Sequence, residues 1–591
     1  MGCGEVFLCV TLFLPALNKF LLLIKPLLKF DTGLNKTMLK SDRIPITVGV
    51  VGHLDVITTD EQKSLIEDLF RDLAERYPNS PVYLFSSIAE GADRYVANIF
   101  LDLKRRYEEF QEKFELIVPT PFELEEYKND FSEASDREFD DLLKQAKRSF
   151  CVGYDDEKNI NRPQQYLKTG KLVADSSLIL IALWDGEAGK TGGTADIVKH
   201  KITGDDDTVA ESTFEYDGTV FILPSKRAKS SYKVSSNLKN NDSLSLDHIL
   251  KDPVLRDALE KIEEINSDSL AIRQPEIEKS QSYLFKKPEK LSTPQKSILN
   301  WYSMMDLLSK QFRKRDIFIT ICLFILGIFL ILALEIYSNI MLKRWVLGIA
   351  MLFIVAATLV YFYSRSTKNH KKYLYNRTLA EALRIQFYWN ITGINKNVSD
   401  YILRIYRKEF TWVKHILSAV YGITYNNGSI SSESINDLTD NWVNNQADFF
   451  ESAIKKMRKQ INFYHKISEI SFAIAFVLLG SILILGKFYE TNNYLNWLLI
   501  IIGTLLGAFA LIKAYIQMKG YEPLVNQYEL MHVIYQKAES KIAEVNNLQM
   551  DIMEKQSYLK ELFFVIGKEA LIENGNWYLI FKEKEPEIEG F

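Results

Sequence analysis

Four long apolar stretches dominate the pattern of hydrophobic and polar positions in the second half of the chain. They are Ile317–Leu334, Trp345–Ser364, Ile470–Gly486 and Tyr494–Ile512, and none of them contains Asp, Glu, Lys, Arg or His. A short turn with Lys343 and Arg344 joins the first pair, and Lys487–Asn493 joins the second. A bilayer core of about 30 Å needs about 20 apolar helical residues. The pattern therefore predicts four membrane-spanning helices in two hairpins.

Before these stretches, short apolar runs alternate with helical patterns. Strands are predicted at Ile46–Val51, Val82–Ser86, Phe114–Val118, Ser177–Leu183 and Thr219–Leu223. Asp60–Tyr77 and Ala89–Tyr107 have the spacing of helices between them. This alternation is typical of a mostly parallel sheet with helices on both faces. We therefore expect an N-terminal α/β domain with a Rossmann-like, doubly wound sheet, followed by an all-α membrane region.

At 591 residues the chain is too long for one core, so several units are expected. The expected units are an apolar leader at 1–37, the α/β domain at 38–225, a linker with charged helices at 226–295, the first hairpin and its following helix at 296–390, a cytosolic helical segment at 391–465, and the second hairpin with C-terminal helices at 466–591.

The leader has neither the basic beginning nor the small-residue cleavage site of a signal peptide. Met38, just before the first predicted strand, favours a translation start there. A membrane anchor, which would be a fifth span, is the alternative.

The distribution of Lys and Arg around the spans predicts their orientation in the membrane. Basic residues gather before the first span at Arg313–Arg315 and before the third at Lys455–Lys459, whereas the hairpin turns carry few. By the positive-inside rule, the N-terminal domain, the segment between the hairpins and the C-terminal segment are cytoplasmic. We therefore expect a multi-pass protein of the inner (cytoplasmic) membrane. The net charge of −4 gives no reason to expect a nucleic acid partner.

The composition of the spans and the spacing of the cysteines argue against some classes of protein and of site. Spans without ionisable residues argue against an ion-coupled transporter. The four cysteines have no spacing that suggests zinc or a disulfide framework, and no metal site is predicted. Gly503 and Gly507 form a GxxxG pattern, which favours close helix contact, with chance occurrence as the alternative.

Small and polar residues follow three of the predicted strands. In a parallel sheet, ligands bind beyond the carboxyl ends of the strands, where glycines allow close approach and helix N-termini favour anions. We therefore expect a phosphate-bearing, nucleotide-like ligand. The candidate ligand-binding residues are Gly52, His53, Ser87, Glu90, Gly91, Arg94, Asp185, Lys190, Gly192, Gly193 and Thr194. The alternatives are an exposed loop histidine for His53 and a surface salt bridge with Asp93 or Glu90 for Arg94.

These strings, in order, resemble the motifs of SLOG domains. The matching strings are Gly49-Val-Val-Gly52-His53, Ser87-Ile-Ala-Glu90-Gly91-Ala-Asp93-Arg94, Val118-Pro-Thr-Pro121, Leu183-Trp-Asp-Gly186 and Gly192-Gly193-Thr194-Ala195. SLOG domains form the Rossmann-like superfamily shared by LOG-type phosphoribohydrolases and DprA. The resemblance covers about residues 44–225 and implies a nucleotide or nucleotide-derived ligand, without a separate cofactor.

The chain departs from the enzymes of this superfamily in the third loop. LOG-type hydrolases carry Pro-Gly-Gly-x-Gly-Thr-x-x-Glu there. Three positions after Thr194 this chain has Ile197 instead of glutamate, and Asp196 lies one residue short. One residue on a helix rotates a side chain by about 100°. The resemblance therefore implies binding rather than catalysis, and no catalytic residue is assigned.

Residues 296–591 are similar to SLATT-type membrane effectors. The similarity rests on the hairpins, on the stretch Arg377–Trp389, on the helix Tyr521–Ala543 and on the ending Leu562–Trp577. Within the first stretch, pairing of Glu381 with the arginines three and four residues away predicts a stabilised helix. We expect the ending to be a helix that stops at Asn574-Gly575 before a short strand or tail. The similarity implies pore formation or membrane disruption when a sensor detects a nucleotide signal.

Together these features indicate a nucleotide sensor coupled to a membrane effector, as in prokaryotic conflict and defence systems. The helices between 253 and 315 would carry the coupling. Its partners would be the lipid bilayer, a nucleotide-derived small molecule and further copies of the chain, because four weakly polar spans make a poor pore alone. The alternative is a membrane-tethered nucleotide N-glycosidase or phosphoribohydrolase using Glu90, Arg94 and Asp196. A third hypothesis is a scaffold with an empty crevice.

Overall fold

The computed structural model describes residues 43–154, 160–187, 191–204, 218–228, 250–340, 342–402, 410–426, 435, 437–491 and 494–582. The predicted leader, the candidate residue Lys190 and most of the predicted connector after residue 226 lie outside these residues.

The N-terminal domain contains a six-stranded, all-parallel sheet in the order β5-β4-β3-β1-β6-β7. Its strands are β1 (Ile46–Gly52), β3 (Val82–Phe85), β4 (Phe114–Thr120), β5 (Arg148–Cys151), β6 (Ile179–Trp184) and β7 (Thr219–Pro224). Two short strands, β2 (Val56–Ile57) and β8 (Lys226–Arg227), pair antiparallel beside it. The predicted doubly wound fold is confirmed.

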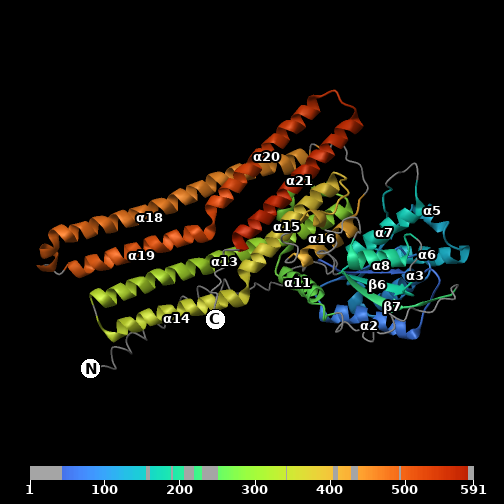
Figure 1. The fold of residues 1–591 in the computed structure, drawn as a ribbon, viewed down its shortest axis with the longest axis horizontal. Helices are drawn as coiled ribbons and strands as arrows, with labels where there is room; N and C mark the ends of the chain where they lie inside the picture. Colours follow the sequence, from blue (N-terminus) through green and yellow to red (C-terminus); the bar gives the residue numbers. More distant parts are fainter. Residues whose placement is uncertain are drawn as a thin grey trace.

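Helices cover both faces of this sheet (Figure 1). On one face lie α2 (Asp60–Arg76) and α3 (Ala92–Arg106), and on the other lie α7 (Arg162–Ser176) and α8 (Thr194–Thr203). The short helices α4 (Glu108–Gln111) and α5 (Leu124–Lys128) and the helix α6 (Glu133–Gln145) precede β5. Because both faces are covered, the central strands are apolar throughout, as in β6.

Long helices form the rest of the molecule. They are α11 (Pro253–Ser269), α12 (Gln274–Leu284), α13 (Thr293–Asn339), α14 (Arg344–Thr367), α15 (Asn369–Ile391), α16 (Thr411–Thr424), α18 (Asn445–Thr491), α19 (Leu495–Lys519), α20 (Tyr521–Asn547) and α21 (Ile552–Lys582), with a π-helix at Thr439–Asn444. We call α11, α12, the first half of α13, α15, α16, α20 and α21 the helical body.

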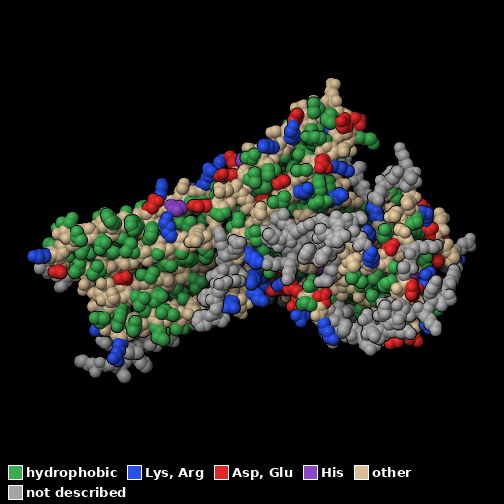
Figure 2. All heavy atoms as spheres, viewed as in Figure 1, with side chains coloured by type: hydrophobic (Ala, Val, Ile, Leu, Met, Phe, Trp, Pro, Cys, Tyr) green, Lys and Arg blue, Asp and Glu red, His purple; other side chains and the backbone are tan. Residues whose placement is uncertain are grey.

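Four helices are long and apolar enough to cross a membrane, and they contain the four predicted spans. Figure 1 shows α13, α14, α18 and α19 extending away from the sheet as two hairpins, and Figure 2 shows that hydrophobic side chains dominate their surface. The helices pack in the sequence α14, α13, α19, α18. Such a row buries little of each helix, so most of its apolar surface is left for lipid.

The GxxxG pattern lies at the contact between the two hairpins. A β-carbon on Gly507 would come within 2.8 Å of Ile331 on α13, and one on Gly503 would overlap the side chain of Glu335. The predicted close helix contact is therefore confirmed, and chance occurrence of the pattern is the weaker interpretation.

The predicted end of the last helix was wrong. Helix α21 continues through Asn574 and Gly575 to Lys582. Both residues are buried against α15, where the Asn574 side-chain amide donates to the Thr378 carbonyl at 3.0 Å. Tertiary contacts therefore override the weak helix propensity of the Asn-Gly pair.

The helical body docks on the amino ends of the strands. Glu263 on α11 accepts hydrogen bonds from the Asn79 backbone at 3.0 Å and from the Ser80 hydroxyl at 2.7 Å, just before β3. Asn266, one turn later, pairs with the backbone of Ile44 just before β1, at 2.8 and 3.1 Å. The carboxyl ends of the same strands lie at the opposite edge of the sheet.

Helix α16 forms the second part of this joint. Gly422 packs against Ser176 at the end of α7 so tightly that a β-carbon would lie 2.5 Å from the Ser176 β-carbon. Arg148, at the start of β5, donates to the carbonyl oxygens of Ile423 and Tyr425. The Tyr425 ring also stacks on Phe150 at 5.2 Å between centroids, so the end of α16 covers the edge strand β5.

Candidate functional site

The three candidate loops follow β3, β1 and β6, which are neighbours in the sheet. The chain runs from β1 toward β5 on one side and returns to β6 on the other, so the topological switch lies between β1 and β6. In open α/β sheets this is where ligands bind. The structure thus brings the loops containing Gly52, Gly91 and Asp185 to one edge, as the sequence predicted.

His53 and Asp185 face each other across the switch. His53 Nε2 lies 3.0 Å from Asp185 Oδ1, and Asp185 is only 4% exposed. The same carboxylate oxygen accepts the backbone N–H of Glu187 at 3.1 Å. His53 is therefore not simply an exposed loop residue, since the pair joins the loop after β1 to the loop after β6.

The glycines of these loops let the loops touch one another. Gly91 has φ +81°, and a β-carbon there would overlap the carbonyl oxygens of His53 and Leu54. A β-carbon on Gly52 would overlap that of Ala92, at the start of α3. The sequence predicts a ligand that lies close to Gly52 and Gly91. In the structure, neighbouring residues of the chain occupy this space. A ligand-binding role for the two glycines stays a prediction.

Arg94 is buried beneath the second loop, which excludes the alternative of a surface salt bridge with Asp93 or Glu90. It is 3% exposed, and its Nε donates to the Ile88 carbonyl at 2.9 Å. Nη1 donates to the Ser135 carbonyl at 2.9 Å, and the guanidinium lies 4.6 Å from the centre of the Phe131 ring. Nη2 is buried without a hydrogen-bond partner. Arg94 therefore holds the loop in place, and its Nη2 group remains as a hydrogen-bond donor without a partner.

Asp93 holds the same loop from the first turn of α3. Its buried carboxylate is hydrogen-bonded to the backbone N–H groups of Ala89 and Ser87, and burial raises the pKa of Asp93 to about 7 despite these bonds. Between them, Ile88 has φ +46°, a left-handed conformation that a β-branched residue rarely adopts. Such backbone strain is concentrated at functional sites.

Glu90 and Ser87 lie on the outer side of this loop. The Glu90 carboxylate accepts the Ser132 backbone N–H at 3.2 Å. Partial burial opposes its ionisation, yet hydrogen bonds from Ser135 and Ser132 outweigh this and lower the pKa of Glu90. The Ser87 carbonyl accepts the Tyr127 hydroxyl at 3.3 Å. An ionised Glu90 is thus fixed at the rim of the loop.

The third loop ends at the start of α8. Gly193 is the N-cap and offers no side chain, while Thr194 is buried in the first helical position. Asp196 Oδ2 accepts the Gly192 backbone N–H at 3.0 Å, so the carboxylate already serves the helix N-terminus. This contact makes Asp196 a poor substitute for a catalytic acid. The N–H groups of the first turn still favour a negative group there.

Helix α7, which was not predicted, connects this loop to the helical body. At its start, Gly192 packs within 2.5 Å of the Pro163 carbonyl oxygen, measured from an ideal β-carbon. At its end, Ser176 meets Gly422 of α16. The signal that would have identified it is the Asn161–Pro163 helix start, with a side-chain cap and proline in the first turn.

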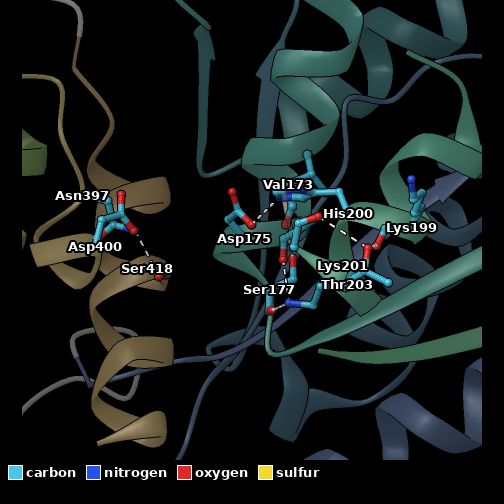
Figure 3. A network of polar contacts seen from close by, with 12 residues as sticks. Val173, Asp175, Ser177, Lys199, His200, Lys201, Thr203, Asn397, Asp400 and Ser418 are labelled. Atoms are coloured by element: carbon cyan, nitrogen blue, oxygen red, sulfur yellow. Dashed lines mark hydrogen bonds and ion pairs between the residues drawn. The ribbon is translucent and has the colours of Figure 1, made fainter. Parts of the chain in front are cut away.

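Figure 3 shows how α8 holds the end of α7 close to the joint. His200 Nε2 lies 2.8 Å from Asp175, and Lys201 Nζ donates to the carbonyls of Ala174 at 2.8 Å and Ser177 at 2.6 Å. Burial lowers the pKa of Lys201 to about 8. On the opposite side, in the same view, Asn397 donates to Ser418 of α16 at 3.0 Å.

A second ionisable cluster lies inside the helical body. Glu381 on α15 pairs with Arg377 at 2.5 Å and with Arg384 at 2.6 Å, as predicted, but the three lie in a helix that is buried almost throughout. Glu573 on α21 faces them, and burial together with the charge of Glu381 raises its pKa to about 7. The sequence interpretation of a plain stabilised helix missed this interior position.

No protein-family model matches the chain, and no curated protein matches it. The SLOG and SLATT resemblances and the ligand-binding roles of the candidate residues therefore stay predictions.

Proposed function

We propose that the N-terminal domain binds a nucleotide-derived ligand and that its occupancy controls the membrane hairpins. The observation that carries this proposal is the meeting of three loops at the switch between β1 and β6, where this class of sheet binds ligands. The second loop supports it, because Ile88 is strained and one buried N–H of Arg94 has no partner. The start of α8 supports it too, because its N-cap Gly193 offers no side chain.

A continuous set of contacts supports coupling to the hairpins. Helix α7 touches the third loop at one end and α16 at the other. Helix α11 binds the amino edge of the sheet through Glu263 and reaches α15 through Asp268, which accepts from Lys372 at 2.8 Å. Helix α15 in turn packs along α13, which continues into the first hairpin. A ligand shifts this assembly only if it prefers one of its conformations.

We propose further that the domain and the helical body are cytoplasmic and that the output is a pore or membrane disruption by an oligomer. The orientation follows from the basic residues that flank the spans on the side of the domain and the helical body. The output follows from the resemblance of the membrane region to SLATT-type effectors. An open row of four helices encloses no channel by itself, so several copies are required.

The test is a binding screen of the purified full chain in detergent against linear and cyclic nucleotides and ADP-ribose, read by thermal shift and calorimetry. Gly193→Asp places a carboxylate at the start of α8 and should weaken binding of an anionic ligand about tenfold or more. Gly348→Ala, in a membrane helix with nothing near its β-carbon, is the matched control. Binding without turnover, followed by leakage of reconstituted liposomes, supports the proposal.

The same screen tests the enzymatic alternative. A nucleotide N-glycosidase should release free base, and Glu90→Gln should abolish the release. Ile197, at the position of the LOG-type glutamate, is 6% exposed and packs in the core, which disfavours this alternative. If no nucleotide binds and no base is released, the sensor and enzyme proposals both fail, and the scaffold hypothesis is left.

A further inference from the structure

His370 lies at the bend where the first hairpin leaves the helical body. It is in the first turn of α15, two residues after Lys368, whose left-handed conformation (φ +49°) separates α15 from α14. The last turn of α21 and the helix α13 lie beside this bend (Figure 1). Three helices that are distant in sequence therefore meet at one histidine.

Both nitrogens of the His370 ring face acceptors on other helices. Nδ1 lies 3.4 Å from Oδ2 of Asp316 on α13, and Nε2 lies 3.2 Å from the carbonyl oxygen of Phe581 on α21. Neither an ionised carboxylate nor a carbonyl has a proton to donate. A neutral imidazole has one N–H and one lone pair, whereas an imidazolium donates from both nitrogens. Only the charged ring can therefore form both hydrogen bonds.

The partners of the ring favour its charged form. Phe581 lies in the last turn of α21, where the helix dipole attracts a positive group. The side chains of His370 and Asp316 are 23% and 18% exposed, so solvent screens this pair less than a surface pair. The start of α15 opposes a positive ring through its own dipole, but the carboxylate and the carbonyl act at hydrogen-bond distance.

Other titratable groups surround the ring in the described part of the chain. The Tyr373 ring meets His370 edge-on at 6.3 Å between centroids, and burial raises its pKa, so it adds no charge at neutral pH. The nearby cations are Arg313 on α13, Lys519 on α19, Lys582 on α21 and, beside His370, Lys368 and Lys371. Arginine and lysine ordinarily stay charged between pH 6 and 8, so histidine is the group here that changes charge in that range.

We infer that His370 is a proton-operated clamp: the charged ring ties the end of α21 and the helix α13 to the start of α15, and the neutral ring releases one of them. Helix α13 continues into the first hairpin and α14 returns from it, so the clamp closes around the base of this hairpin. Packing at this base thus depends on pH near neutrality. The inference goes beyond the proposed function, since the clamp needs no ligand.

The first test measures the charge of the ring directly. In the full chain labelled with 15N-histidine and reconstituted in lipid, the two ring nitrogens of His370 should both give the NMR signals of hydrogen-bonded N–H groups at pH 6. One of them should change to the signal of a bare nitrogen as pH rises. His370→Phe assigns the signals by deleting them. A ring that is neutral at pH 6 overturns the inference.

The second test measures the release, from hydrogen exchange in the last two turns of α21 of the full chain in detergent. At pH 6, His370→Phe, whose ring has no N–H, should exchange several-fold faster than the unaltered chain. At pH 8 this difference should disappear, whereas His370→Arg, which stays charged, should exchange more slowly than both. Chains are compared at the same pH, so the titration of Glu573 affects them equally.

His532→Gln is the matched control. One ring nitrogen of His532, on α20, lies 3.1 Å from the Ala447 carbonyl oxygen, and no described carboxylate pairs with this ring. This variant should match the unaltered chain at both pH values. If His370→Phe exceeds the unaltered chain by the same factor at pH 6 and at pH 8, the contact is structural and insensitive to protons, and the inference is overturned.

Discussion

Ser176, the last residue of α7, packs against Gly422 of α16 with no room for a side chain between them. One of these residues belongs to the α/β domain and the other to the helical body. Because α7 reaches from this point to the third candidate loop, the contact connects the edge of the sheet that carries the candidate residues with the helical body. The joint between the two parts is therefore rigid and closely packed rather than a linker.

Gly422→Val is expected to open this joint. The added side chain would collide with Ser176 and with the Phe85 ring, and overpacking of this kind costs about 1–3 kcal/mol. Hydrogen exchange in α16 and in the last turn of α7 should increase. Gly480→Val, at a glycine with nothing near its β-carbon, is the control. Hydrogen exchange equal to that of the unaltered chain would show that this contact does not stabilise the joint.

Gly91→Ala is expected to disturb the second candidate loop. The φ of +81° and the overlap with the Leu54 carbonyl together predict a loss of about 1–3 kcal/mol in the free energy of unfolding. Thermal unfolding of the full chain in detergent measures this loss. Gly486→Ala, which meets nothing, should leave the unfolding temperature unaltered. A stable Gly91→Ala protein would show that the loop can separate from the turn after β1.

Glu573 should make the helical body less stable as pH rises. Its pKa is raised from 4.5 to about 7 in the folded chain, so the folded state holds a proton that the unfolded state has released. Stability is therefore greatest below about pH 4.5 and falls by about 3 kcal/mol as pH rises through 7. Hydrogen exchange in α15 and α21 between pH 5 and 8, corrected for the intrinsic rate, measures the fall.

Glu573→Gln should remove this pH dependence, because the amide does not titrate. Glu561→Gln, at an exposed carboxylate on the same helix, should retain it. If both variants follow the unaltered chain, the pH response arises from another group, such as Asp93, whose pKa is also raised to about 7.

The proposed orientation predicts which loops a membrane-impermeant maleimide can reach. Leu342→Cys lies in the first hairpin turn, and Leu548→Cys lies between α20 and α21; both positions are exposed. In a background with the four native cysteines replaced by serine, the first should react in intact cells. The second should react only after permeabilisation. The reverse result would invert the topology and place the α/β domain outside.

The apolar patterns were enough to predict the sheet, its central strands and the four membrane helices. They missed β5, because Arg148–Cys151 is a short, partly exposed edge strand whose one large apolar side chain, Phe150, stacks on the distant Tyr425. They also ended α21 at Asn574, because the bond to Thr378 that keeps the helix intact comes from a residue distant in sequence.

The edge of the sheet that carries the candidate residues was predicted, but the contacts of those residues were not. Strand order places the three loops together, and the positions of Gly52, His53 and Asp185 after strands were visible in the sequence. What the glycines touch depends on the packing of neighbouring loops, which no local pattern contains. For the same reason the sequence could not show that Arg94 is enclosed by Phe131 and Ser135, which come from α6 and the turn before it.

The helical body docks on the amino ends of the strands, whereas the candidate loops lie at the opposite edge of the sheet. Loops at the other rim can gain, lose or exchange residues while Glu263, Asn266 and Gly422 keep their contacts. One pair of membrane hairpins could thus serve domains with very different specificities. Chimaeras that graft new rim loops onto this scaffold would keep their anchorage, which makes the chain a natural starting point for engineered, ligand-gated membrane proteins.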